Sequence, residues 1–170
     1  MHKYVLAPLA AGVLLALAGT AQAATKQTTF QVSATVNPVC VVSAGAMNFG
    51  TYDATAALAA TSQIDVRCTN GATYQVALSA GNGTYGTRLL KGNGTNTMAY
   101  NLYSSDPSAG SASVWGDGST STATVSGTGK GMASANAVPH TVYGQLPNIT
   151  ANQNAPTGTY TDTITVSVNY

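Results

Sequence analysis

Apolar and polar residues alternate in short runs along much of the chain. The run at 160–170 places four apolar side chains on one face of an extended backbone: Ile164, Val166, Val168 and Tyr170. The intervening residues are polar. Because successive side chains of a strand point to opposite faces, this pattern predicts a half-buried strand. No turn follows it, so we expect an open sheet edge, which invites pairing with another chain unless something covers it.

A second alternating run lies at 28–37. Its apolar positions are Phe30, Val32, Ala34 and Val36, and its polar positions are Gln31, Ser33, Thr35 and Asn37. Further short strands are predicted at 62–69, 73–79, 98–103, 122–126 and 138–147. Residues 39–42 lead Cys40 into the body of the fold, and 87–91 is a short run between two Gly-Asn-Gly-Thr segments. Asn70-Gly71 separates two of these runs and predicts a tight hairpin, because a type I′ turn needs positive φ at both of its central residues.

The fold class expected from these runs is all-β. The strands are short and separated by Gly, Asn, Ser and Thr, and no helical periodicity interrupts them. Strands of this length and spacing predict a β-sandwich. The regular alternation of apolar residues argues against disorder, despite the abundance of polar residues.

The first residues have the pattern of a secretory signal peptide. A short basic start at Met1-His2-Lys3 precedes an apolar run at 5–18, and Ala21-Gln22-Ala23 is a small-residue cleavage site. The apolar run is shorter than a membrane-spanning helix needs. We therefore expect residues 1–23 to direct export to the periplasm and to be removed, leaving one domain.

Charge is sparse and balanced after residue 23. There are five basic residues (Lys26, Arg67, Arg88, Lys91, Lys130) and five acidic residues (Asp53, Asp65, Asp106, Asp117, Asp162), so the net charge is 5 − 5 = 0. Nucleic acids and anionic membranes are bound by clustered Lys and Arg, which this chain lacks. The sequence therefore predicts no nucleic-acid partner.

Few residues could carry chemistry. Cys40 and Cys68 are the two cysteines, and an even pair in an exported protein predicts a disulfide. Together with His140 they are too few for a closed zinc site, so no metal or cofactor is expected. His140 could act as the base of a hydrolase, but no Gly-x-Ser-x-Gly elbow accompanies it. We expect no catalytic residues and no small-molecule substrate.

Several segments together resemble a known family. They are Phe30–Val36, Cys40, Met47–Tyr52, Val66–Gly71, Tyr74–Ser79, Met98–Tyr103, Val114–Gly118, Thr141–Gly144 and Pro156–Tyr170. In order and spacing these segments resemble the spore coat protein U domain family, and within it the major subunits of archaic, Csu-type chaperone–usher pili.

The resemblance implies a non-enzymatic, immunoglobulin-like sandwich that lacks its last strand. A periplasmic chaperone would supply that strand first, and the N-terminal extension of the next copy would replace it at an outer-membrane usher. Residues 24–37 would then be the donor strand, and 38–170 the domain that receives it. Phe30, Val32, Ala34 and Val36 would insert. Ile164, Val166, Val168 and Tyr170 would border the groove of a head-to-tail surface fibre that serves adhesion and biofilm formation.

Other interpretations stay open at this point. The run at 28–37 could be the first strand of a complete sandwich in its own molecule. The protein could instead be a spore-coat structural protein. It could also be a monomeric module that binds carbohydrate or a surface through its tyrosines and Trp115.

Overall fold

The computed structural model describes residues 22–119 and 121–170, and the chain divides into two units between Thr35 and Val36. Described residues 22–35 form neither helix nor strand. The signal peptide expected at 1–23 lies almost entirely outside the described residues. Within the described ranges, no helix is long and apolar enough to cross a membrane.

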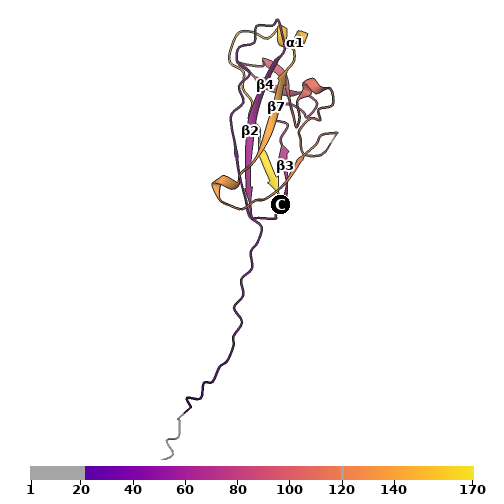
Figure 1. The fold of residues 1–170 in the computed structure, drawn as a ribbon. Coiled ribbons are helices and arrows are strands. Elements are labelled where there is room, and N and C mark those ends of the chain that lie inside the picture. Colours follow the sequence, from indigo (N-terminus) through magenta and orange to yellow (C-terminus); the bar gives the residue numbers. More distant parts are fainter. Residues whose placement is uncertain (1–21, 120) are drawn as a thin grey trace, which may run out of the picture. The chain divides into compact units, whose positions relative to one another are not determined.

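The second unit contains the strands, which form two antiparallel sheets in the described residues (Figure 1). The five-stranded sheet has the order β1 (Cys40–Ala44), β2 (Leu58–Cys68), β7 (Val138–Leu146), β5 (Thr97–Tyr103) and β4 (Arg88–Lys91). The three-stranded sheet has the order β6 (Val125–Thr128), β3 (Thr73–Leu78) and β8 (Val166–Asn169). Short helices η1 (Pro107–Ala109), η2 (Ser134–Asn136) and α1 (Thr150–Gln153) lie in the connections.

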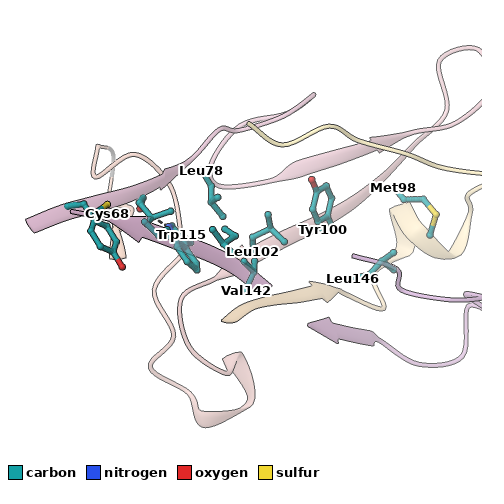
Figure 2. Packing of buried hydrophobic residues seen from close by; sticks show 12 residues of the cluster. Cys68, Leu78, Met98, Tyr100, Leu102, Trp115, Val142 and Leu146 are labelled. Atoms are coloured by element: carbon teal, nitrogen blue, oxygen red, sulfur yellow. Dashed lines mark hydrogen bonds between the residues drawn. The ribbon is translucent and has the colours of Figure 1, made fainter. Parts of the chain in front are cut away.

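The hydrophobic core lies between the two sheets. Ile64, Val66 and Cys68 of β2 are buried on one face, as their alternation predicts. Trp115 is fully buried, and its indole N–H donates a 2.9 Å hydrogen bond to the carbonyl of Val76. Figure 2 shows its ring beside Leu78 and Leu102, which come from different sheets. The all-β, immunoglobulin-like sandwich expected from the sequence is confirmed.

The hairpin predicted at Asn70-Gly71 is wrong. The chain does turn there, because the N–H of Ala72 donates to the carbonyl of Thr69 at 3.0 Å. However, β2 and β3 belong to different sheets. Gly71 has a φ of 81°, whereas Asn70 is not among the residues with positive φ. A type I′ turn needs positive φ at both positions, so this turn carries the chain from one sheet to the other instead.

The strand predicted at 28–37 does not form in this chain. An extended segment becomes a strand only when its N–H and C=O groups meet those of a neighbour. Phe30 is 87% exposed, Val32 81% and Val36 78%, which is unusual for large apolar side chains. The alternation is therefore present without a partner strand in the described structure.

The predicted disulfide is confirmed. Cys40 and Cys68 are bonded, with their Cα atoms 4.1 Å apart, and they face each other at one end of the β1–β2 ladder. Cys40 is the first residue of β1, so the bond ties the start of the folded unit to an interior strand. The carbonyl of Val39 also accepts a 2.9 Å hydrogen bond from the N–H of Thr69.

Candidate functional site, an open apolar groove

A groove of about 990 Å³ opens along the core of the second unit. One wall is the segment 44–52, which begins at the last residue of β1, and the other is 155–164, which leads into β8. Between the walls the lining consists of core side chains, namely Ile64, Leu78, Leu90, Met98, Tyr100, Leu102, Val142 and Leu146. We call this feature the open groove. Most of both walls is chain outside the named strands.

Both sheets end beside this groove. In the described residues β1 pairs with β2 alone, and β8 pairs with β3 alone. The two edge strands approach each other, with Cα atoms within 8 Å. Edge strands normally carry charge, prolines or a covering segment that prevents pairing with other chains. The β8 sequence Val-Ser-Val-Asn contains none of these charges or prolines.

The backbone of β8 has a free side. The N–H of Ser79 donates to the carbonyl of Thr165 at 3.0 Å, so these residues form a hydrogen-bonded pair. Bonded and non-bonded pairs alternate along an antiparallel ladder, so the next bonded pair is Ala77 with Ser167. The N–H and C=O groups of Val166 and Val168 therefore point to the outer edge, away from β3. That edge offers a ladder position to another strand.

The opposite wall is held by packing against a glycine. Met47 and Phe49 are half-buried, and the intervening Asn48 is exposed. A Cβ atom at Gly144 of β7 would collide with the sulfur of Met47 and would lie 2.9 Å from Cζ of Phe49. The Phe49 ring also meets Tyr100 edge to face, with centroids 6.0 Å apart. Gly144 thus makes room for this wall to lie close to β7.

The residues predicted for the acceptor edge are only partly together. Ile164 and Val166 line the open groove. Val168 is half-buried against the core. Tyr170 is 60% exposed and lines a separate shallow hollow with Tyr74 and Gly127. On the predicted donor side, Ala34 is exposed like its three apolar neighbours.

Sequence reasoning missed several residues of the groove. The segment Met47–Tyr52 enters the sequence analysis only through the family resemblance, although Met47 and Phe49 alternate with Asn48 and Gly50. Asp162 also lines the groove and was not singled out for it. The alternation of the strand predicts this position, because residue 162 lies an even number of positions before Ile164, Val166 and Val168. Side chains at such positions share one face of a strand.

His140, the residue considered above as a possible base, contacts a tyrosine. Nε2 of His140 lies 2.9 Å from the hydroxyl of Tyr74, and the two rings meet edge to face. Burial lowers the pKa of His140, and the charge of Asp65 partly opposes that shift. Among residues 22–119 and 121–170, no group of three or more His, Cys, Asp or Glu side chains could hold a metal ion.

A two-sheet immunoglobulin-like sandwich with an apolar groove beside an edge strand that is paired on one side only is the class of domain that the fold and site define. The family follows from comparison of the sequence. A model of the spore coat protein U domain matches residues 26–167, and the chain belongs to this family.

Two comparisons with individual proteins agree with this assignment. The chain is 29% identical to "Protein U" of Myxococcus xanthus over 190 residues, covering 99% of this chain and 98% of that protein. It also resembles a chain in the crystal structure of the CsuC–CsuE chaperone–tip adhesion subunit pre-assembly complex from archaic chaperone–usher Csu pili of Acinetobacter baumannii. That match has a TM-score of 0.54 and 24% identity, and it covers 80% of this chain and 41% of the other. At that identity the likeness establishes the shared fold.

Proposed function

We propose that this protein is a non-enzymatic structural subunit of a surface fibre, a pilus, in which each copy completes the fold of the next. The alternating segment 28–37 of one copy would lie in the open groove of another, as a strand beside β8. The observation that carries this proposal is the open groove next to the outward-pointing backbone groups of Val166 and Val168.

The chemistry of the two parts is complementary. The groove lining is largely apolar, and Phe30, Val32, Ala34 and Val36 would present an apolar face to it. The main chain of the added strand would supply affinity, and its alternate side chains would supply specificity. At about 3.3 Å per residue, the nine residues from 28 to 36 would extend over about 30 Å. The segment 28–37 carries no charged side chain, so its insertion would bring no charge of its own into the groove.

The contact joins two different surfaces of the same molecule. Such a head-to-tail contact propagates into a filament when its rotation does not close a ring. An empty groove would also expose apolar surface before assembly. We therefore include a periplasmic chaperone as the first occupant of the groove and an outer-membrane usher as the place of exchange. The same proposal covers export, display at the cell surface, and a role in adhesion and biofilm formation.

A pair of matched variants tests the proposal. Phe30→Arg places a charge on the inserting face, whereas Gln31→Arg places the same charge on the opposite face of the same segment. We expect wild type and Gln31→Arg to form oligomers that survive heating in detergent on a gel, and Phe30→Arg to fold without forming them. Normal fibres from Phe30→Arg would show that this segment does not fill the groove. A wild-type protein that stays monomeric would favour a binding module instead.

A further inference from the structure

The groove wall that leads into β8 forms hydrogen bonds with a strand of one sheet before Asp162 and with a segment of the other sheet after it. On one side of it, Thr161 exchanges two backbone hydrogen bonds with Lys91 of β4, of 2.8 and 2.9 Å. On the other side, Thr165 is bonded to Ser79, which follows β3. The wall is therefore tied to the five-stranded sheet before Asp162 and to the three-stranded sheet after it.

Asp162 is the one inward-facing charge of this wall within 162–168. Residues 162, 164, 166 and 168 are half-buried, and the residues between them are exposed. Its neighbours on the inward face are Ile164, Val166 and Val168. A carboxylate among apolar side chains needs hydrogen-bond partners, because an unpaired buried charge is costly.

The carboxylate finds its partners on three segments. Oδ2 accepts a 2.7 Å hydrogen bond from the hydroxyl of Tyr100 on β5. The N–H of Asn82, in the β3–β4 connection, donates to both carboxylate oxygens at 3.1 and 3.3 Å. Oδ1 also accepts a 2.7 Å bond from the N–H of Thr163. One side chain thus joins the groove wall to the groove lining and to the loop that connects the two sheets.

The neighbouring loop is shaped to fit the carboxylate. Gly81 has a φ of 62°, and a Cβ atom there would collide with the carboxyl group of Asp162. The positive φ favours glycine in its own right. Burial, followed by the hydrogen bond to Asp162, raises the pKa of Tyr100, so the phenol stays protonated and remains a donor.

From these contacts we infer that Asp162 is a positioning residue of the open groove. It holds the wall at 161–165 at the distance from Tyr100 that an incoming strand requires. The inference rests on the proposed function, since the strand it serves is the one supplied by another copy. The charge matters as well as the shape, because hydrogen bonds to a charged acceptor are roughly twice as strong as neutral ones.

The test compares strand uptake in three variants of the full chain. Each variant also carries Phe30→Arg, so that copies do not fill one another's grooves. Asp162→Asn keeps the size of the side chain and removes its charge. Tyr100→Phe keeps the ring and removes the hydroxyl. Asp106→Asn is the matched control, since Asp106 also accepts a backbone N–H bond, from Ser108 at 2.9 Å, but is the N-cap residue of η1 and does not line the groove.

The probe is a fluorescent peptide with the sequence of residues 24–37, and its rate of uptake is measured together with amide hydrogen exchange. We expect Asp162→Asn to take up the peptide about tenfold more slowly, with Tyr100→Phe between it and the parent, because each loses a bond to a charged group. The amides of Asn82 and Thr163 should exchange faster in Asp162→Asn, while those of β2 and β7 stay protected. Asp106→Asn should match the parent.

Three results would count against the inference. Uptake in Asp162→Asn at the parent rate would overturn it. Loss of protection throughout β2 and β7 in both Asp162→Asn and Tyr100→Phe would also overturn it, because the contacts would then serve overall stability. Failure of the parent chain to take up any peptide would instead overturn the proposed function, and with it the need for a positioned wall.

Discussion

Nη1 of Arg88 donates a 2.6 Å hydrogen bond to Oδ1 of Asn101, and both side chains are buried in the core of the sandwich. The same guanidinium donates to the carbonyls of Ser79 and Trp115. Burial lowers the pKa of Arg88. The side-chain amide of Asn101 in turn donates to the carbonyls of Tyr85 and Gly86. These bonds join β4, β5 and the loops around them.

Asn101→Ala should therefore destabilise the protein by about 2–3 kcal/mol, because it leaves a buried cation without one acceptor. Urea unfolding, followed by the fluorescence of Trp115, measures the change. Asn93→Ala, an exposed asparagine in the β4–β5 turn, is the control and should change stability little. Equal unfolding midpoints for the two variants would show that the buried bond contributes little.

Reduction of the Cys40–Cys68 bond should lower stability by about 3–4 kcal/mol, because the bond closes a loop with a sequence separation of 28 residues. Thermal unfolding with and without reductant measures this. The chain has two cysteines, so the reductant has one target, and Cys40→Ser with Cys68→Ser should reproduce its effect. An unchanged melting temperature under full reduction would contradict the prediction.

Stability should fall as the medium becomes mildly acidic. Burial holds the pKa of His140 below its usual 6.5, so the folded state binds this proton less tightly than the unfolded state does. The neutral imidazole therefore contributes its stability above pH 6.5 and loses it as the pH falls below that value.

Urea midpoints at about pH 7.5 and about pH 5.5 bracket this transition while leaving ordinary carboxylates ionised. His140→Gln keeps a polar partner for Tyr74 and should lose much of the difference between the two midpoints. A variant with the same pH dependence as wild type would assign the effect to other groups.

Gly144→Ala should disturb the groove wall at 47–49, because the new methyl group would displace Met47 and Phe49. We expect a loss of about 1–3 kcal/mol, typical of an overpacked core, and slower uptake of the donor peptide. Gly86→Ala is the matched control, since the nearest atom to a Cβ there is Oγ1 of Thr84 at 3.8 Å. Wild-type melting temperature and uptake in Gly144→Ala would show that this wall moves aside freely.

The alternation of apolar and polar residues predicted where strands form better than it predicted which segments they pair with or pack against. The alternation at 64–68 and 98–102 correctly marked residues that are buried. The same kind of alternation at 28–37 marked residues that are exposed in this chain. Alternation reports that one face of a segment can be buried, but it does not say which segment, or which molecule, will cover that face.

By itself the sequence determined that this is an all-β protein with a disulfide between Cys40 and Cys68, because side-chain period and cysteine number are properties of the chain alone. Only the tertiary structure decided that the turn at Asn70-Gly71 leads to a different sheet. It also decided that Arg88 lies in the core and that Asp162 meets Tyr100 across the groove. The last of these contacts joins residues 62 positions apart, which no local pattern encodes.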